Sequence, residues 1–361
     1  MKIIKVRTKP AYEIEIRGGL LTDLAQDLKD RGYGDRYFLI TDSNVRQLMA
    51  EDLLEMLREA GLPVEILSFP AGEASKNMAT VVELARKMVQ AGADRRSAIV
   101  AFGGGVTGDI AGFLASIYMR GIAYIQIPTT LLAQVDSSVG GKTGVDLPEG
   151  KNLLGTFYQP RRVYIDYAVL GLLPLREIRQ GLAEVVKYGM IKSQRLFKYL
   201  ERHSGEIMQL EPEPLEHIIA ESCRIKAWVV SKDEKEAGLR RILNFGHTLG
   251  HAFEAASAWR LPHGEAVAVG MVAAAKISEK RGLISPEITH RLENLLTSLG
   301  LPVRLALELP VSEVLTYLRS DKKARSQWPV FVLVRDIGET VFDPEVPEAM
   351  VKEVAEELGC R

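Results

Sequence analysis

The sequence predicts an α/β domain with a mostly parallel sheet, followed by a second domain that is mostly helical. Short strand-like runs alternate with helix-like runs through the first half, whereas from about Pro174 apolar residues recur at helical spacing instead. The 361 residues are also more than one ordinary domain needs. We therefore expect a first domain at residues 1–172 and a second at residues 173–361.

The strand-like runs of the first half differ in their patterning. Residues Tyr12–Ile16 alternate polar and apolar side chains, as in a partly exposed strand, whereas Tyr37–Ile40 is continuously apolar, as in a buried one. Helix-like segments at 45–60 and 78–91 separate such runs, which predicts βαβ units with helices on both faces of the sheet. Further strands are expected at Val64–Leu67, Ala98–Phe102, Ala123–Ile127 and Val163–Ile165.

The second half has apolar residues three and four positions apart, which is typical of amphipathic helices. A short β-like run at Val330–Val334 comes before a last helix-like segment at 348–358. Other helices are expected at 181–191, 215–230, 266–280, 287–299 and 311–318.

The composition is that of a globular protein with sizeable cores, since 47% of its residues are hydrophobic. Lys and Arg total 46 against 47 Asp and Glu, so general attraction to nucleic acid or to membranes is not expected. Two distant cysteines, Cys223 and Cys360, favour a reducing compartment, and no apolar run reaches membrane-spanning length. We therefore expect a soluble, cytoplasmic enzyme whose anion sites are local.

A glycine-rich turn follows the expected strand at Ala98–Phe102. Gly103, Gly104 and Gly105 lead into a helix-like segment, so the backbone could approach a pyrophosphate at a helix N-terminus, although such glycines are often only a turn. Polar groups after three other strands favour a ligand site at the same sheet edge: Asp42, Pro70–Lys76 and Pro128–Thr130. The Gly-Lys-Ser/Thr of a P-loop is absent from this turn, so a Rossmann-like NAD-binding domain is favoured over an ATP site.

A second polar, glycine-rich segment covers residues 134–145. It contains Lys142, and Lys151 and Asn152 follow closely. Lysines and an amide in such backbone suit phosphate groups, and a solvated hairpin is the alternative interpretation.

The densest group of potential ligands lies in residues 240–265, which hold three of the six histidines. A guanidinium, an amide and imidazoles together suit a metal and an anionic ligand, although each histidine could be a satisfied structural group. The HExxH zinc signature is not met, so spacing alone leaves open which histidines bind metal. A second helix could bring His263 back to the first. One stripe of that first helix is expected to carry Arg240, Asn244, His247 and His251.

Other charged groups have an equally good structural interpretation. Glu184 and Lys187, three residues apart on one helical face, could form a surface ion pair. Lys226 with the acidic run that ends at Glu236, and the segment Asp321–Lys323, could be solvated surface.

Six segments, in order and at compatible separations, resemble the 3-dehydroquinate synthase family over nearly the whole chain. They are GGGVTGD at 103–109, PTTLLAQVDSSVGGKTGVD at 128–146, KNLLGTFYQP at 151–160, GLAEVVKYG at 181–189, LNFGHTLGHAFE at 243–254 and HGEAVAVGM at 263–271. The resemblance implies an N-terminal NAD-binding domain and a helical C-terminal domain, with the active site in the cleft between them.

The resemblance implies a ligand set for one divalent metal, zinc or cobalt: Glu184, His247 and His263. The family's substrate, 3-deoxy-D-arabino-heptulosonate 7-phosphate (DAHP), carries a carboxylate, which the resemblance assigns to Arg240 and Lys226. The implied phosphate contacts are Lys142, Asn152, Asn244, His251 and one of Lys322 and Lys323, and the implied contacts of the ring hydroxyls are Asp136, Lys187 and Glu236.

NAD contacts and a partner subunit are also implied by the resemblance. Arg120 matches an arginine that a neighbouring subunit lends to the phosphate site, which implies a homodimer. The implied cofactor residues are Asp42, Asn44, Glu73, Lys76, Gly103, Gly104, Gly105, Asp109, Thr129, Thr130, Lys142 and Lys151.

The implied activity is that of a carbon–oxygen lyase of the shikimate pathway, which converts DAHP to 3-dehydroquinate and phosphate. The reaction combines transient oxidation by NAD, phosphate elimination, re-reduction and intramolecular aldol closure. The chain departs from the family at Leu172, where a threonine is usual, which could weaken a contact to the adenosine half of NAD. A sister sugar-phosphate cyclase, a metal-dependent polyol dehydrogenase and a NAD-binding sensor are the alternatives.

Overall fold

The computed structural model of the protein describes residues 1–320 and 328–361. These residues form two compact units. Unit 1 consists of Met1–Pro174 and Leu215–Lys235, and unit 2 consists of Leu175–Pro214 and Glu236–Arg361. Within the described ranges, no helix combines the length and the apolar character that crossing a membrane would require.

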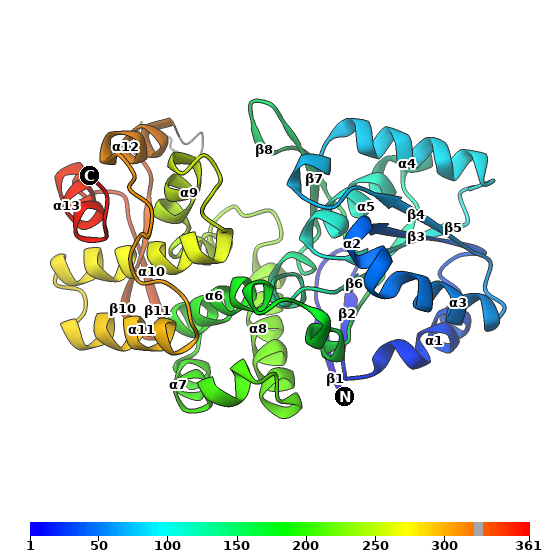
Figure 1. The fold of residues 1–361 in the computed structure, drawn as a ribbon, viewed down its shortest axis with the longest axis horizontal. Helices are drawn as coiled ribbons and strands as arrows, with labels where there is room; N and C mark the ends of the chain where they lie inside the picture. The colour runs from blue at the N-terminus through cyan, green and yellow to red at the C-terminus, as the bar shows by residue number, and fades with distance from the viewer. Residues whose placement is uncertain (321–327) are drawn as a thin grey trace. The chain divides into compact units, whose positions relative to one another are not determined.

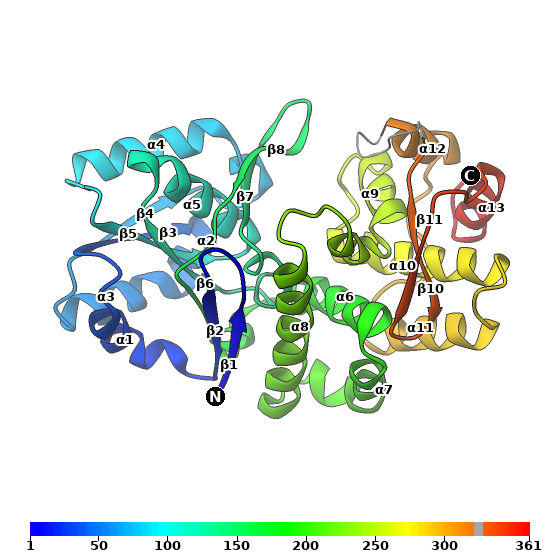
Figure 2. The same ribbon diagram turned by 180° about the vertical axis from the view of Figure 1, so that it is seen from behind.

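Unit 1 is built on a sheet that has seven strands in the described part of the chain (Figures 1 and 2). The strands lie in the order β1-β2-β9-β6-β5-β3-β4, and all neighbours are parallel except β1 and β2. The mostly parallel sheet and all six strands that the sequence predicts are confirmed. The bounds are β1 (Lys2–Val6), β2 (Tyr12–Ile16), β3 (Arg36–Asp42), β4 (Val64–Phe69), β5 (Ser97–Gly103), β6 (Ala123–Pro128) and β9 (Arg162–Ile165).

Helices cover both faces of this sheet, as predicted. On one face, Leu28 of α1 and Leu57 of α3 pack in one core with Leu39 of β3. On the other face, Leu84 of α4 packs in a second core with Phe38 of the same strand. Successive residues of a strand point to opposite faces, so β3 serves both cores. The helices are η1 (Leu20–Asp23), α1 (Leu24–Arg31), α2 (Ser43–Val45), η2 (Arg46–Ala50), α3 (Glu51–Glu59), η3 (Glu73–Ser75), α4 (Met78–Gln90), α5 (Gly105–Ile117), η4 (Tyr118–Arg120), η5 (Ala133–Ser137), η6 (Tyr167–Leu172) and α8 (Pro212–Lys232).

The glycine-rich segment after β6 forms the short helix η5 and then a hairpin. Strand β7 (Lys142–Leu147) pairs antiparallel with β8 (Gly150–Phe157). β7 packs against α5, whereas the residues of β8 are exposed or half-buried. The hairpin interpretation therefore describes the backbone correctly.

Helix α8 belongs mainly to unit 1 although it follows the first helices of unit 2 in the sequence. Lys226 Nζ lies 2.7 Å from Asp136 Oδ1, and Ser231 Oγ accepts a hydrogen bond from Arg7 N at 2.9 Å. The division into domains at 172/173 stays a prediction, and the compact units differ from it by placing Leu215–Lys235 in unit 1. Helical periodicity shows that a segment has an apolar face but not which core that face joins.

Unit 2 is mostly helical, as predicted, and α10 packs against α6, α9, α11 and α13 (Figure 1). Small residues of α10, such as Ala266, Gly270 and Ala273, are buried and let the neighbouring helices come close. The predicted strand at 330–334 is confirmed, but its partner β11 and helix α7 were not predicted. The elements are α6 (Leu175–Lys192), α7 (Gln194–Met208), η7 (Leu239–Asn244), α9 (His247–Ala256), α10 (His263–Lys280), α11 (Pro286–Ser298), α12 (Val311–Ser320), β10 (Phe331–Asp336), β11 (Glu339–Asp343) and α13 (Glu348–Glu357).

One buried cation joins the antiparallel edge of the unit 1 sheet to its parallel part. Arg162 of β9 is 3% exposed, and its guanidinium lies 2.5 Å from Glu13 and 2.6 Å from Glu15 of β2. Replacing it with methionine would leave the half-buried Glu15 without its counter-charge. We expect Arg162→Met to lower the free energy of unfolding by about 2–3 kcal/mol, less than for a fully buried pair because Glu13 is 41% exposed. Urea unfolding followed by circular dichroism measures this change.

Lys87→Met is the matched control, because it removes a cation from an exposed ion pair with Glu83. It should leave the urea midpoint unchanged. An equal midpoint for both variants would contradict a structural role for the Arg162 pairs.

Candidate active site

Three potential metal ligands from three helices converge in unit 2. Nε2 of His247 lies 3.3 Å and Nε2 of His263 lies 3.4 Å from Oε1 of Glu184. One ligand atom of each residue lies within 4.8 Å of the others. Glu184 is only 1% exposed, so this carboxylate is held by the surrounding protein rather than by water.

The helix that carries His247 is shorter than the sequence suggests. The expected single helical stripe from Arg240 to His251 is wrong, because η7 ends at Asn244 and α9 begins at His247. Gly246 between them has φ +77°, which interrupts a right-handed helix. The expectation that a second helix returns His263 to the first is confirmed, since α10 begins at His263 and packs against α9.

Glycines allow the backbones of these helices to approach closely. A Cβ on Gly270 would overlap the carbonyl oxygen of Gly246 and lie 2.8 Å from the nitrogen of Gly250. A Cβ on Gly264 would lie 2.6 Å from Cα of Gln180, one turn before Glu184 on α6. Backbone contact between helices therefore sets the positions of all three ligand residues.

The buried carboxylate of Glu184 is surrounded by groups that favour its ionised form. Burial alone would raise its pKa, but the ammonium of Lys187 and the two imidazoles hold the pKa of Glu184 well below its usual value. Lys187 is itself buried and forms an ion pair with Glu184. Burial lowers the pKa of His263, but contacts with the carboxylates of Glu184 and Glu254 outweigh it and raise that pKa to about 10.

The ring orientation of His247 fits a metal ligand. Its Nδ1 lies 3.1 Å from the carbonyl oxygen of Phe245, which can only accept, so Nδ1 carries the proton. In the neutral ring, the lone pair of Nε2 then faces the carboxylate of Glu184, an arrangement that is repulsive unless a cation or a proton lies between them. Both oxygens of Glu184 are buried; Oε2 is paired with the ammonium of Lys187, whereas Oε1, which faces the two imidazoles, lacks a well-formed hydrogen bond from the described residues. One glutamate and two histidines form a known type of catalytic zinc set, so the donor atoms fit a divalent metal.

Three other residues expected at the substrate site, Arg240, Asn244 and His251, also belong to unit 2. Arg240 is buried on η7, and Asn244 donates a hydrogen bond to Glu236 Oε1 at 3.4 Å. His251 is one turn after His247, and the two rings are 5.2 Å apart, edge to face. Lys322 and Lys323 lie outside the described residues.

In unit 1, Asp42 and the glycine turn meet where the order of the strands reverses. β4 lies on one side of β3 and β5 on the other, so α3 and α5 cover opposite faces, and a crevice is expected at the carboxyl ends of β3 and β5. Asp42 and Gly103 are the last residues of these strands. Thr107 donates a hydrogen bond to Asp42 Oδ2 at 3.3 Å, so the two ends are neighbours.

The beginning of α5 fits a pyrophosphate. Gly104 precedes the helix and provides no side-chain cap, so the first N–H groups of α5 are not satisfied by a capping side chain. A Cβ on Gly105 would lie 3.1 Å from Ser137 Oγ, so glycine keeps the approach to the helix open. The residues present therefore fit a dinucleotide.

A cluster of charged and polar groups lies along the same edge. Lys76 Nζ lies 2.6 Å from Asp109 Oδ2 and 2.6 Å from Asn152 Oδ1, and Lys151 Nζ lies 4.0 Å from Glu73 Oε1. Burial alone would lower the pKa of Lys76, but the carboxylates of Asp109 and Glu73 raise it above its ordinary value. The ammonium is therefore charged at neutral pH.

The other unit 1 residues that the resemblance assigns to cofactor or substrate lie at separate positions. Thr129 N donates to Gly103 O at 3.0 Å, and Thr130 Oγ1 caps the next helix by accepting from Ala133 N at 3.1 Å. The exposed residues are Asn44 after β3, Arg120 at the end of η4 and Lys142 at the start of β7.

Two family models match consecutive parts of the sequence. The N-terminal model of 3-dehydroquinate synthase matches residues 66–180, and the C-terminal model matches residues 181–324. A curated 3-dehydroquinate synthase from Symbiobacterium thermophilum is 48% identical over 343 residues, which are 94% of this chain and 96% of that protein. The chain belongs to the 3-dehydroquinate synthase family.

Solved structures of related cyclases have the same fold. A 2-deoxy-scyllo-inosose synthase complexed with carbaglucose-6-phosphate, NAD⁺ and Co²⁺ is 32% identical and superposes with a TM-score of 0.91, covering 99% of this chain and 100% of that one. A 2-epi-5-epi-valiolone synthase from Streptomyces hygroscopicus subsp. jinggangensis with NAD⁺ and Zn²⁺ bound is 31% identical, with a TM-score of 0.89 and 96% of each chain covered. The predicted fold class is therefore confirmed.

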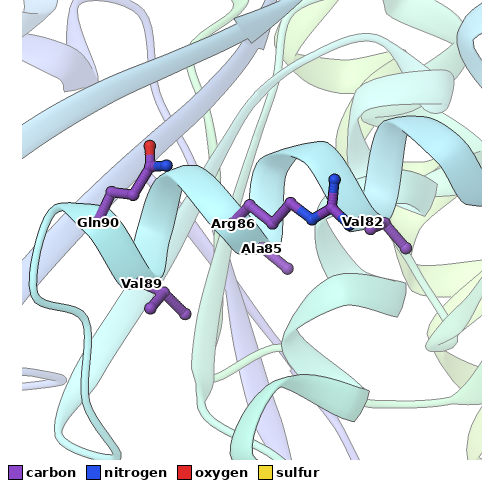
Figure 3. A pocket seen from close by; sticks show the side chains of 5 residues that line it. All are labelled: Val82, Ala85, Arg86, Val89 and Gln90. Atoms are coloured by element: carbon purple, nitrogen blue, oxygen red, sulfur yellow. The ribbon is translucent and has the colours of Figure 1, made fainter.

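The hollow shown in Figure 3 is unrelated to the family's motifs. It has a volume of about 350 Å³ and lies on the exposed side of α4, lined by Val82, Ala85, Arg86, Val89 and Gln90. Its lining contains one charged group and no residue that the resemblance assigns to cofactor or substrate. We give it no role in the family's chemistry.

Two residues beside the proposed metal-ligand cluster of Glu184, His247 and His263 were not predicted from the sequence. Glu254 lies on α9, and its Oε2 lies 3.4 Å from Nδ1 of His263. Gln180 lies on α6 and accepts a hydrogen bond from the backbone N–H of Gly264. The spacing of Glu254, three residues after His251 and seven after His247, was a signal for a shared helix face.

The close approach of α9 and α10 can be tested at Gly270. We expect Gly270→Ala to lower the free energy of unfolding by about 3 kcal/mol or more, because the added Cβ overlaps the backbone of Gly246. Zinc binding should weaken as well, because the helices that carry His247 and His263 must separate. Chemical unfolding and a chelator competition assay measure the two effects.

Gly205→Ala on α7 is the matched control, because a Cβ there meets nothing within 4 Å. It should stabilise the protein by about 0.5–1 kcal/mol through the lower helix propensity of glycine. If Gly270→Ala behaved in the same way, the proposed backbone contact would be wrong.

Proposed function

We propose that the chain is a 3-dehydroquinate synthase that converts DAHP to 3-dehydroquinate and phosphate. The observation that carries this proposal is the convergence of Glu184, His247 and His263 in a chain that has the family's motifs from 66 to 324. The curated relative at 48% identity is a 3-dehydroquinate synthase, which supports DAHP over the substrates of sister cyclases.

We propose that NAD and one divalent metal, zinc or cobalt, are the cofactors. Glu184, His247 and His263 would hold the metal, and Asp42, the turn Gly103–Gly105 and the Lys76 cluster would hold NAD. When bound, the metal supplies a Lewis acid and NAD supplies a hydride acceptor. The NAD⁺ with Co²⁺ or Zn²⁺ in the two related cyclase structures supports this pair of cofactors.

The side chains of the protein then bind and orient the substrate. In unit 2, Lys187 neutralises Glu184, and its ammonium is proposed as a contact of a substrate hydroxyl. In unit 1, the backbone carbonyl of Asp136 accepts from Lys226 at 2.6 Å and its carboxylate lies 2.7 Å from the same ammonium, which holds that lysine in one orientation. Lys226 is proposed as a cation for the substrate carboxylate. Preorganised charges of this kind contribute to catalysis because they need no reorganisation during the reaction.

The substrate carboxylate is proposed to bind Arg240. A guanidinium forms two parallel hydrogen bonds with a carboxylate, and the burial of Arg240 strengthens them. The related cyclase was solved with carbaglucose-6-phosphate, which has no carboxylate. A buried arginine at this position therefore favours DAHP as the substrate.

We also propose that two chains form a homodimer and that Arg120 is offered to a neighbouring subunit. Arg120 is exposed at the end of η4, where a side chain is accessible to a second chain. Light scattering of the full chain tests the dimer. A monomer at assay concentrations would contradict it.

The activity itself is tested by release of inorganic phosphate from DAHP with a catalytic amount of NAD. We expect phosphate release without net accumulation of NADH, and loss of most activity after treatment with a chelator, because the metal and NAD both act within one turnover. Re-addition of zinc or cobalt should restore the rate.

The same assay separates the alternatives. Phosphate release from seven-carbon sugar phosphates or hexose phosphates, with none from DAHP, would make the protein a sister cyclase. Accumulation of NADH on a polyol without any phosphate release would contradict the synthase and favour a dehydrogenase.

The carboxylate contact is tested by Arg240→Ala. We expect kcat/KM for DAHP to fall roughly 100-fold, since a charged hydrogen-bonding pair contributes about 1.5–3 kcal/mol. Zinc and NAD binding should persist. Arg241→Ala is the matched control, because this neighbouring guanidinium lies over the ring of Phe342, 5.4 Å from its centroid, and its loss should leave turnover near normal. Near-normal turnover by Arg240→Ala would refute the assignment.

A further inference from the structure

A buried carboxylate outside the proposed metal-ligand set faces one of the ligands. Glu254 lies in the last turns of α9 and is 5% exposed. Its Oε2 lies 3.4 Å from Nδ1 of His263 and 4.0 Å from Nε2 of His251. An ionised carboxylate is costly to bury unless its oxygens are hydrogen-bonded, so its position beside an imidazole needs a reason.

The two nitrogens of His263 face two different carboxylates. Nδ1 faces Glu254, and Nε2 lies 3.4 Å from Oε1 of Glu184. A carboxylate oxygen can only accept a hydrogen bond, so Glu254 requires a proton on Nδ1. In a neutral ring this leaves the lone pair on Nε2, directed toward Glu184 and His247.

In His247 the proton also lies on Nδ1 and the lone pair on Nε2, but a backbone group rather than a carboxylate accepts from Nδ1. Its Nδ1 lies 3.1 Å from the backbone oxygen of Phe245, a contact that no side-chain substitution at Phe245 removes. The orientation of His263 depends instead on the side chain of Glu254. The two histidines are therefore held by a carbonyl and a carboxylate respectively, the two acceptors that usually orient histidine ligands of metals.

We propose that Glu254 is a positioning residue that fixes the ring of His263 for coordination of a divalent cation through Nε2. The inference rests on the proposed metal site at Glu184, His247 and His263. Glu254 itself does not touch the cation, because it contacts the edge of the ring that faces away from Glu184. Its effect is on the affinity for the cation, which can be measured without turnover.

The test compares zinc and cobalt affinities of the full chain by competition with a chromophoric chelator. Glu254→Gln keeps the shape and one neutral acceptor, whereas Glu254→Leu removes the acceptor at a similar volume. We expect affinity to fall about 10-fold in the first and about 100-fold in the second, the range found for residues that orient metal ligands. The absorption spectrum of bound cobalt should also change, because the ring of His263 turns.

Glu206→Gln is the matched control. Glu206 makes the same type of contact, 3.3 Å from Nδ1 of His203, on the surface of α7, and its loss should leave metal affinity unchanged. Unfolding in the presence of a chelator shows whether the Glu254 variants are folded. If Glu254→Leu does not fold, Glu254→Gln decides the question.

The outcomes are distinct. One tightly bound cation in the wild type with affinity unchanged within about twofold in Glu254→Gln would overturn the positioning role and leave the metal site intact. No cation in the wild type would overturn the metal site itself. A second cation that disappears in both Glu254→Gln and His251→Ala would make Glu254 a ligand, since His251, Glu254 and His263 also have ligand atoms within 4.8 Å of one another, and would overturn the inference.

Discussion

The contact between the backbones of α9 and α10 is the constraint on which the metal-ligand cluster depends. Gly246, Gly250 and Gly270 remove the side chains that would separate the helices, and Gly264 does the same where α10 meets α6. A Cβ on Gly270 would overlap the backbone of Gly246, so the two helices, and with them the imidazoles at their first residues, would have to move apart. The glycines therefore serve the proposed site by letting the helices approach closely. They lower the helix propensity of these segments, and the ligand geometry explains why they are nevertheless present.

The burial of charged groups in this cluster is unfavourable for the stability of the fold. Glu184 and Lys187 are both buried, and an ion pair in such surroundings loses more hydration than its attraction restores unless other groups complete its hydrogen bonds. The low pKa of Glu184 shows that the cluster favours its ionised form, which is the form that binds a cation. A protein selected only for stability would fill this space with apolar side chains. The buried charges are therefore better explained by the chemistry of the site than by the stability of unit 2.

Much of the fold could be predicted because local patterns coincide with the final environment. The continuously apolar run at 37–40 is buried on both faces of the sheet, whereas the alternating run at 12–16 has one buried and one partly exposed face. The break before His247 could not be predicted, because the apolar spacing continues through it, whereas the backbone leaves the helical conformation at Phe245, with ψ 127°, and at Gly246, with φ +77°. Helix α8 was predicted as a helix but not as part of unit 1, since an amphipathic pattern does not show against which core the helix packs. Glu254 was missed for the reason that acids near histidines are usually surface groups.

The interruption at Gly246 also separates the residue proposed to bind the substrate carboxylate from the residue proposed to bind the metal. Arg240 and Asn244 lie on η7, whereas His247 and His251 lie on α9, so the buried guanidinium and the proposed metal ligand His247 are on different helices. In one continuous helix, any change that moved Arg240 would also move His247. With a glycine of positive φ between them, η7 and α9 are separate elements, and α9 packs against α10. The position of Arg240 is therefore set by a different element from the one that sets the position of His247.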